Sequence, residues 1–419
     1  MTTNLIVILV FIAVAFCDFL LYVLSPRLRR FSMVVARVLL GLVFLFSGFV
    51  KAVDPLGSMY KFDDYFQAFG MPWLQSISLA LGFVLFSLEF LLGFAFVFNA
   101  RIKMLSWLMM LFMTFFFILT FILAIKNPVS DCGCFGDALI LSNWETFFKN
   151  ISLMIFALVV FNARKKVTNR FPKFTQNGIL VLGLLIIVSV STYSYRYLPI
   201  IDFMHWKVGT QIAKEVVPTP EIADITLVYK NKETGEKLEY TSKTLPWKDT
   251  VFFHKLEFVE QKKKVIQEYK PAPIHDFMVD DSNKVNRNQQ IISNPNYQFL
   301  LISSDLSHAE PSVFAALNTF YEQCTKDTIG FDALCGSDFK SMAQFALKNN
   351  AAYQFYGVDA TALKSVVRSN PGLVLLKNGV VLDKWAWRCF PTYEKFKAKI
   401  PKYETKLAEI LKNTQPVKK

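Results

Sequence analysis

Two cysteines separated by a single glycine are the residues of this chain whose types and spacing best suit chemistry. Cys132, Gly133 and Cys134 lie in the stretch SDCGCFGD between two long apolar runs, and the chain has six cysteines among its 419 residues. A disulfide needs Cα atoms about 4.4–6.8 Å apart, so cysteines at this spacing can bridge only where the chain bends, which Gly133 permits. Such a short ring is strained, exchanges readily and adds little stability. We therefore predict a redox-exchange pair formed by Cys132 and Cys134.

Two other roles of the cysteine pair stay open at the level of sequence. A static disulfide clip on a loop would use the same residues without any exchange. A metal site is the weaker alternative, because a closed zinc site needs four ligands and the pair supplies only part of such a set. We predict no metal.

The composition indicates a membrane protein. The chain is 53% hydrophobic with 42 Phe, yet its net charge is +13, a combination typical of membrane proteins with basic loops. Apolar runs of about 18 residues or more can cross a bilayer as helices. Six such runs occur at about 4–24, 32–50, 73–98, 104–125, 144–161 and 178–199. We interpret the first as a retained helix rather than a signal peptide, because it lacks a basic leading region and a small-residue cleavage site. The predicted partner is the lipid bilayer, with no nucleic acid.

The basic residues predict the orientation of the helices. Loops that carry an excess of Lys and Arg face the cytoplasm, and here they follow the first, third and fifth runs. Their members are Arg27, Arg29, Arg30, Arg101, Lys103, Arg164, Lys165, Lys166, Arg170 and Lys173. The cysteine pair and everything after about residue 199 would then face the other side. We predict a multi-pass protein of a bacterial inner (cytoplasmic) membrane whose C-terminal part lies in the oxidising periplasm.

Ionisable residues lie within the apolar runs. Glu89 is about 14 Å from the cytoplasmic end of its helix, where a carboxylate is costly unless it is paired or neutral. Arg37 and Asp18 lie about 8–9 Å deep by the same count, so a cluster of these three residues could form a proton path or contact a quinone headgroup. In the alternative, Arg37 reaches the lipid headgroups and Glu89 is a protonated packing residue. Quinone is the one cofactor that the sequence suggests, because all four histidines follow the last span and none is placed to hold a b-type haem.

The second half of the chain changes character. Residues 201–270 show strand-like alternation around a Glu233-Thr234-Gly235 turn, with Lys262–Lys264 as a solvated face or hairpin tip. From about residue 271, strands alternate with helices, which predicts an α/β layer fold. The stretch PGLVLLKNGVVLDKW predicts an antiparallel hairpin with an Asn378-Gly379 turn.

Two family resemblances rest on these stretches. RVLLGLVFLFSGFVKAVDP at 37–55, SLEFLLGFAF and CGCFGD together resemble the DoxX/MauE family of redox-associated membrane proteins, a four-helix membrane fold, over about 31–165. This resemblance implies a role in disulfide formation or electron transfer for exported proteins. Residues 271–419 resemble the thioredoxin fold in its TlpA-like and peroxiredoxin-like branch, with DFMVDD as an added N-terminal hairpin and Pro371 as the cis proline that begins the last hairpin.

The reactive motif of the thioredoxin fold is missing. Ser307, His308, Ala309 and Glu310 stand where that family has Cys-x-x-Cys, so the domain resembles a degenerate binding module without CxxC.

The remaining cysteines offer no obvious substitute for that motif. Cys335 and Cys389 could both lie near Pro371 as an unorthodox thiol site, or could be inert buried residues. We expect no bond between Cys324 and Cys335, because they lie at opposite ends of antiparallel elements. Cys17 lies in an apolar run as a small apolar residue.

These observations predict five parts. They are an N-terminal transmembrane helix (1–30), a four-helix membrane domain (31–165), a sixth transmembrane helix (166–200), a β-rich segment (201–270) and a thioredoxin-like domain (271–419). The predicted function is thiol–disulfide exchange or electron transfer for exported proteins through the Cys132–Cys134 pair, which would make the chain a possible thiol–disulfide oxidoreductase. Its partner would be a periplasmic thiol protein or a separate thioredoxin-like carrier. The alternative is a non-catalytic membrane scaffold whose degenerate domain binds a partner. Transport of a solute past Glu89 has less support, because no broken helix pair is evident.

Overall fold

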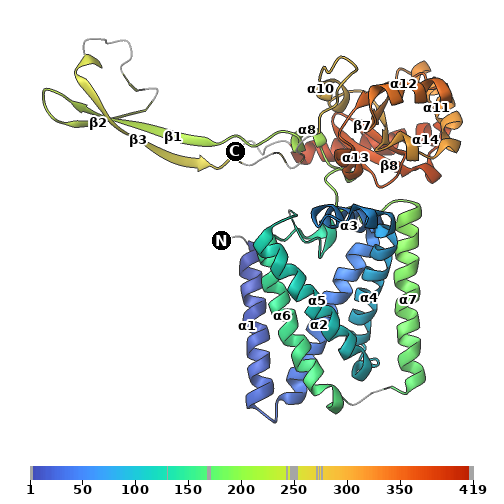
Figure 1. Ribbon diagram of the computed structural model, residues 1–419. Coiled ribbons are helices and arrows are strands. Elements are labelled where there is room, and N and C mark those ends of the chain that lie inside the picture. The colour runs from blue at the N-terminus through green and yellow to red at the C-terminus, as the bar shows by residue number, and fades with distance from the viewer. Residues whose placement is uncertain are drawn as a thin grey trace. The chain divides into compact units, whose positions relative to one another are not determined.

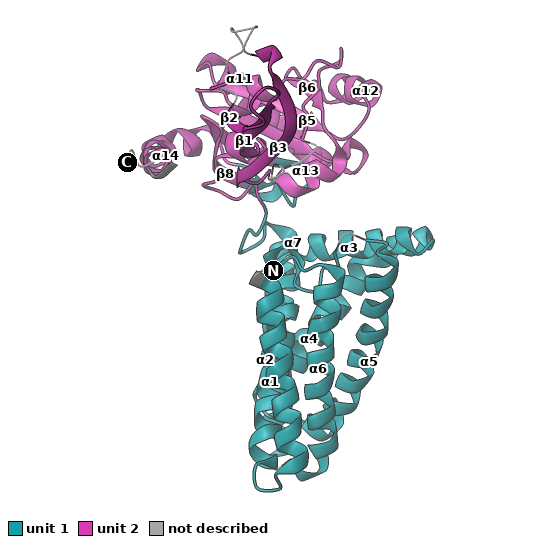
Figure 2. Ribbon diagram, turned by 90° about the vertical axis from the view of Figure 1, so that its left-hand side faces the viewer, with its two compact units in different colours: residues 1–204, 367–372, 385–390 teal, residues 205–366, 373–384, 391–419 magenta. Residues whose placement is uncertain are grey.

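The computed structural model describes residues 3–129, 131–167, 171–241, 244–245, 253–269, 272, 274 and 277–414. The chain divides into two compact units (Figure 2). The first comprises residues 1–204 with the two short segments 367–372 and 385–390, and the second comprises 205–366, 373–384 and 391–419.

Among the described residues, six helices are long and apolar enough to cross a membrane. They are α1 (Thr3–Leu24), α2 (Arg29–Val53), α4 (Ser78–Val97), α5 (Ile102–Lys126), α6 (Asn143–Ala163) and α7 (Lys173–Arg196). Each overlaps one predicted run, so the prediction of six spans is confirmed. The chain is a multi-pass membrane protein.

The helices pack through apolar side chains and through small residues. The first helix joins the bundle, since the ring of Phe11 packs 5.5 Å from that of Phe156 on α6. Close approach of α2 and α4 depends on Gly48, where an added Cβ would lie 2.7 Å from the carbonyl oxygen of Phe86. Gly93 on α4 is equally tight against Leu45 of α2. The helices α2 and α4 therefore pack closer together than they could if Gly48 or Gly93 had a side chain.

One end of the bundle is covered by short elements. Helix α3 (Pro55–Ala68) lies across this end (Figure 1), followed by the 3₁₀ turn η1 (Pro72–Ile77). Asp54 caps α3 by accepting the Gly57 N–H at 2.9 Å, with Pro55 at the first helical position, where its missing N–H costs nothing. The turn η2 (Gly136–Ala138) lies in the loop that joins α5 to α6, and η3 (Arg164–Lys166) follows α6. The cysteine loop is thus held at the end where α3 lies.

The α/β part of the second unit contains a five-stranded sheet in the order β6-β5-β4-β7-β8, in which β4, β5 and β6 are parallel. The strands are β4 (Gln298–Ser303), β5 (Gly330–Cys335), β6 (Gln354–Gly357), β7 (Gly372–Lys377) and β8 (Val380–Ala386). The helices are α8 (Ile212–Glu215), α10 (Asn288–Ile292), α11 (Phe314–Lys326), α12 (Phe339–Asn349), α13 (Ala360–Val366) and α14 (Tyr393–Thr414). Short 3₁₀ turns are η4 (Leu306–His308), η5 (Pro311–Val313) and η6 (Trp387–Cys389).

The predicted alternation of strands and helices is confirmed, although the sequence reading missed β6 and α13. The turn between β7 and β8 has positive φ at both Asn378 (51°) and Gly379 (71°), as a two-residue hairpin requires. The Asn370–Pro371 peptide bond is cis, as the family resemblance implied for Pro371. Of the predicted DFMVDD hairpin, residue 276 lies outside the described residues, and Asp280 forms single bridges to Asn286 and Gly357.

A separate antiparallel sheet contains β1 (Ile222–Asn231), β2 (Lys237–Thr241) and β3 (Leu256–Gln267) in the order β2-β1-β3. The hairpin around Glu233–Gly235 is confirmed. Lys262–Lys264 lie within β3, exposed and opposite Asp224–Thr226, so they form a solvated strand rather than a hairpin tip. Among the described residues between 253 and 269, β3 is one continuous strand of 12 residues.

A segment before β1 pairs with the β7–β8 hairpin, which lies in the predicted C-terminal part. Gly209 N–H donates to the carbonyl of Val381, and Ile212 N–H to that of Gly379. The segment from Gly209 to Ile212 therefore hydrogen-bonds to the β7–β8 hairpin and covers backbone groups that an open sheet edge would leave unpaired.

Candidate functional site

The two sulfurs of the Cys-Gly-Cys motif face each other. Cys132 Sγ lies 2.9 Å from Cys134 Sγ, and both cysteines are free thiols. The predicted bend is present, since Gly133 has a φ of +63°, which glycine adopts without steric cost. Asp131 accepts the Gly133 N–H at 2.9 Å, and the Tyr65 hydroxyl donates to the carbonyl of Cys132 at 2.7 Å. Both contacts fix the backbone that brings the sulfurs together.

The two cysteines have opposite acidities. The hydrogen bond from Cys132 lowers the pKa of Cys134 to about 6, although burial opposes this, and the charges of Lys149 and Lys51 lower it further. The same hydrogen bond, together with burial, raises the pKa of Cys132. These shifts favour the thiolate form at Cys134 and the protonated form at Cys132.

A buried ion pair lies beside this thiolate. Lys51 Nζ is 2.7 Å from both carboxylate oxygens of Glu89, and the two side chains are only 8% and 6% exposed. Ser47, one turn before Lys51 on α2, lies 2.9 Å from Glu89 Oε2 and 2.7 Å from the carbonyl of Cys134. The ion pair is thus connected through one hydroxyl to the backbone of the cysteine loop.

Asp18, Arg37 and Glu89, which the sequence allowed to form one cluster, contact different groups in the structure. Arg37 donates to the main-chain carbonyls of Phe96 and Val97 near the end of α4. The carbonyl of Asp18 accepts the Ser32 hydroxyl at 2.9 Å. The depth of a residue along its helix does not say which way its side chain faces. The close packing of α2 against α4 at Gly48 and Gly93 brings Lys51, in the last turn of α2, to Glu89.

Sequence reasoning missed Lys51 and Lys149. Lys51 follows directly after the predicted run 32–50, and its spacing of four residues from Ser47 places both on one face of a helix. Lys149 interrupts the fifth apolar run, and its ammonium lies 4.5 Å from the ring centroid of Phe135. Both lysines are charged residues within a membrane-spanning helix, and such residues often mark a functional site.

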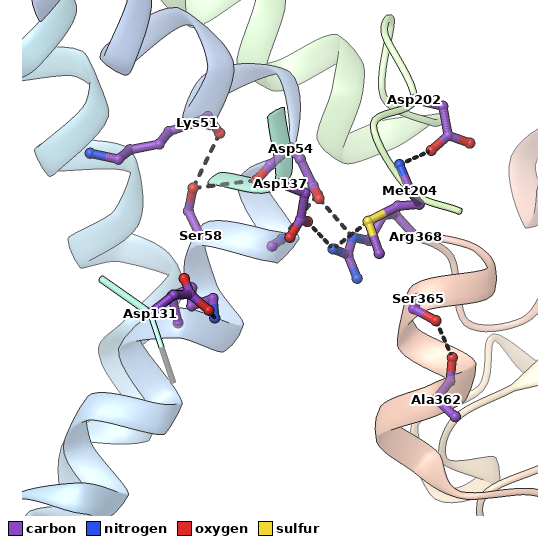
Figure 3. A network of polar contacts seen from close by, with 12 residues as sticks. Lys51, Asp54, Ser58, Asp131, Asp137, Asp202, Met204, Ala362, Ser365 and Arg368 are labelled. Carbon is purple, nitrogen blue, oxygen red and sulfur yellow. Dashed lines mark hydrogen bonds and ion pairs between the residues drawn. The ribbon is translucent and has the colours of Figure 1, made fainter. Parts of the chain in front are cut away.

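A second polar network holds the end of the cysteine motif (Figure 3). Arg368 Nε donates to Asp54 Oδ2 at 2.8 Å, and Arg368 Nη2 lies 3.1 Å from Asp137 Oδ2 and 3.3 Å from Met204 Sδ. Arg368 is 8% exposed and belongs to the segment 367–372 of the first unit. Two carboxylates therefore share one buried guanidinium, and Asp137 closes the CGCFGD stretch at this point.

Two cavities meet at Cys134. The larger is about 290 Å³ and is lined mainly by apolar side chains of α3, α4 and α5, together with Cys132, Gly133 and residues of the segment 199–204. The smaller is about 30 Å³ and is lined in part by Ser47, Glu89 and Lys149. Cys134 thus lies between a large apolar space and a small one whose lining includes the charged side chains of Glu89 and Lys149.

The other cysteines lie elsewhere. Cys335 ends β5 in the core, and burial raises its pKa. Cys324 is buried in α11, where burial and then Asp327 raise its pKa to about 12. Both are free, so the expected absence of a bond between them is confirmed. Cys389 is exposed in η6, and Cys17 is exposed on α1. Burial of Cys335 fits the inert alternative for that residue.

The family comparison bears on the first unit. Residues 29–163 match the model of the family described as methylamine utilisation protein MauE. This segment is a MauE-like membrane domain. It comprises α2–α6 and so contains the cysteine pair, the Lys51–Glu89 ion pair and Lys149. No curated protein and no solved structure matches the chain.

Proposed function

We propose that the chain is a bacterial inner-membrane dithiol protein whose Cys132–Cys134 pair exchanges disulfides with exported thiol proteins. The observation that carries this proposal is the 2.9 Å separation of the sulfurs, with Cys134 as the stabilised thiolate. The MauE family name refers to methylamine utilisation, and the resemblance to redox-associated DoxX/MauE proteins agrees with a redox role.

The chemistry is a pair of exchange steps. The Cys134 thiolate attacks a disulfide of the partner, forms a mixed disulfide and releases a partner thiolate. Cys132 then loses its proton and attacks the Cys134 sulfur, which forms the Cys132–Cys134 disulfide and releases the second partner thiolate. Two electrons pass from the pair to the partner, and the same steps in reverse oxidise a partner dithiol. Lys51 and Lys149 stabilise the thiolate before each attack.

The proposed orientation places this chemistry in the periplasm. Arg29 begins α2 and Arg164 follows α6, so both lie at the end of the bundle opposite to α3. The cysteine loop lies at the α3 end. Residues 199–204 line the same cavity as the cysteines, so the chain leaves α7 at that end as well. Basic loops favour the cytoplasmic side, which supports a periplasmic cysteine loop and C-terminal part.

We assign the C-terminal part to a thioredoxin-like fold that recruits the partner. The three parallel strands β4, β5 and β6 and the β7–β8 hairpin support this assignment. Because Ser307–Glu310 replace the reactive motif, this domain would bind a periplasmic thiol protein or a thioredoxin-like carrier and leave the exchange to the membrane domain.

Trapping of a mixed disulfide tests the proposal. Cys132→Ser removes the resolving thiol, so Cys134 should accumulate a reductant-sensitive adduct with an exported protein in cells. Cys134→Ser should trap less, because burial still raises the pKa of Cys132 after its hydrogen bond to Cys134 is lost. Cys389→Ser, which removes an exposed cysteine outside the pair, is the matched control and should behave as wild type. If Cys132→Ser gives no adduct beyond that of the double variant, the scaffold alternative is correct.

A further inference from the structure

We propose that buried polar side chains of α6 bind a file of water molecules, which carries the proton of the dithiol to the aqueous surface. This inference rests on the exchange function proposed above for Cys132 and Cys134. It adds a water-binding site and a proton pathway to that function.

Four polar side chains share one face of α6, and together we call them the polar line. They are Asn143, Thr146, Lys149 and Asn150. Thr146 is three or four residues from each of the others, so it lies next to them on the helix surface. All four are buried, with only 1–8% of each residue exposed, although α6 is a candidate membrane span. Buried polar residues inside a span usually mark a functional pathway.

Two atoms of the polar line lack a protein partner. Among the residues that the structure describes, the Thr146 hydroxyl and Asn143 Oδ1 are buried and form no hydrogen bond. A buried hydroxyl in a helix commonly bonds the carbonyl four residues earlier, as Thr120 on α5 does to Phe116 at 2.7 Å. The Thr146 hydroxyl does not, and a buried polar atom without a partner is costly. A bound water removes that cost.

The inner end of the polar line is the cavity of about 30 Å³ beside Cys134. Lys149 and Asn150 line this cavity together with Cys134. About 10–15 Å³ suffices for one water, so the cavity has room for water. Three residues of a helix rise about 4.5 Å, which is less than the span of two hydrogen bonds of about 2.8 Å each. One further water can therefore connect Thr146 to the side chains that line the cavity.

The outer end of the polar line reaches the aqueous surface. Asn143 Nδ2 donates to Asn127 Oδ1 at 2.7 Å and to the carbonyl of Val129 at 2.8 Å. Asn127 is exposed and lies just after α5, in the loop that carries the cysteine pair. The polar line thus runs from an exposed amide through Asn143 and Thr146 to the cavity at Cys134.

The exchange reaction releases a proton at a buried place. When Cys132 attacks the mixed disulfide at Cys134, the S–S bond of the pair forms, the partner thiolate leaves, and the proton of Cys132 must reach water. Cys132 is only 7% exposed, but its sulfur lies 2.9 Å from that of Cys134, which lines the small cavity. The charge of Lys149 lowers the pKa of both cysteines, so the inner end of the polar line acts on both sulfurs. One proton leaves along the waters for each disulfide formed, and one returns when the pair is reduced.

X-ray radiolytic labelling of the full-length protein in lipid nanodiscs tests for the waters, because radicals formed from a bound water oxidise the side chains that touch it. Met113 lines the small cavity and Met109 does not, although both lie on α5 and both are 1% exposed. Met113 should be oxidised several times faster than Met109. Thr146→Val should lower the rate at Met113 towards that at Met109. Equal rates at the two methionines, or no effect of Thr146→Val, would overturn the inference.

The kinetics of exchange test the pathway. Reduced protein that reacts with dithionitrobenzoate releases one coloured thiolate when Cys134 attacks and a second when Cys132 resolves the mixed disulfide. Thr146→Val should slow the second release about two- to tenfold, the factor that corresponds to one neutral hydrogen bond. The first release should not change, because it needs no proton transfer from Cys132.

Two variants are the controls for this measurement. Thr146→Ser keeps the hydroxyl and should restore the second release. Thr114→Val makes the same change on an exposed face of α5 and should behave as wild type. Equal slowing of both releases by Thr146→Val, or no restoration by Thr146→Ser, would mean that packing and not proton transfer is responsible, and the pathway would be wrong.

The pathway and the proposed exchange function can fail separately. If Cys132→Ser traps no mixed disulfide in cells but Thr146→Val slows only the second release, the exchange proposal fails and the proton pathway stands. If mixed disulfides are trapped but Thr146→Val leaves the second release unchanged, the proton pathway is wrong.

Discussion

Arg368 Nη2 lies 3.1 Å from Asp137 Oδ2, so a residue 231 positions further along the chain holds the carboxylate that follows the cysteine pair. Arg368 also binds Asp54, the N-cap of α3. One buried guanidinium therefore connects α3, which lines the larger cavity, to the cysteine loop. The bond matters because a partly buried carboxylate that loses a neighbouring cation is protonated more easily.

The first prediction concerns this guanidinium. Arg368→Ala should destabilise the first unit by about 1–3 kcal/mol, since it takes the buried guanidinium away from two partly exposed carboxylates, Asp54 and Asp137. Burial already raises the pKa of Asp137, and Arg368 opposes that rise, so the pKa should increase further in the variant. Thermal unfolding in detergent micelles measures the loss.

Arg388→Ala is the control for this prediction. Arg388 is exposed, belongs to the same unit and donates to the carbonyl of Arg196. Its removal should change the melting temperature little. Adding Asp137→Asn to Arg368→Ala should restore part of the stability, and no restoration would show that the charge of Asp137 is not the cause.

The second prediction concerns the acidity of Cys134. Because its pKa is lowered to about 6, alkylation of Cys134 by iodoacetamide should rise through about pH 6 and level off above pH 7. Cys132→Ala removes the hydrogen bond that is the largest cause, so the midpoint should move upward. Mass spectrometry of the peptide that contains residue 134 measures the rate. A midpoint near the ordinary value of a free thiol in the wild type would refute the assignment of Cys134 as the thiolate.

The third prediction uses the two members of the buried ion pair. The charge of Lys51 lowers the pKa of Cys134 and that of Glu89 raises it. Lys51→Met should therefore shift the alkylation midpoint upward and Glu89→Gln downward, although each breaks the same ion pair. Each should also destabilise the protein by about 3–5 kcal/mol.

Lys61→Met is the control for that ion pair. Lys61 pairs with Asp131 at 2.8 Å, but its side chain is 29% exposed. Partly solvated pairs contribute about 1 kcal/mol or less, so stability should change little. If Lys51→Met and Glu89→Gln shift the midpoint in the same direction, the effect is structural and not electrostatic.

The sequence predicted those features that depend on neighbouring residues. A membrane span is recognised from a continuous apolar run, so all six were found near their observed bounds. The Asn378-Gly379 turn and the bend at Gly133 follow from the conformational freedom of single residues, and both have the expected positive φ. The strand β6 has only four residues, too few to show the alternation of apolar and polar residues by which a strand is recognised.

The polar contacts of the site could not be predicted in the same way. Glu89 was recognised as a buried carboxylate, but its partner depends on the rotation of α2 against α4 and on their separation. Arg368 stands 314 residues from Asp54, and nothing in the local sequence of either residue indicates the other. The sequence gives the position of a residue along its helix, whereas an ion pair also depends on how the helices are rotated and how far apart they are.

The last prediction tests whether the bend at Gly133 is needed for exchange. Gly133→Ala places a Cβ 3.0 Å from Lys61 Cγ at a φ of +63°, so it should cost about 1–2 kcal/mol of stability through backbone strain. Gly70→Ala is the matched control, because Gly70 has a φ of +72° and open space around it. Both variants should lose similar stability, but only Gly133→Ala should slow mixed-disulfide formation in the Cys132→Ser background, since it alone displaces the cysteine loop. Trapped adduct, measured at equal protein level, compares the two. Equal slowing in both variants would mean that general destabilisation, and not the geometry of the cysteine loop, limits the exchange.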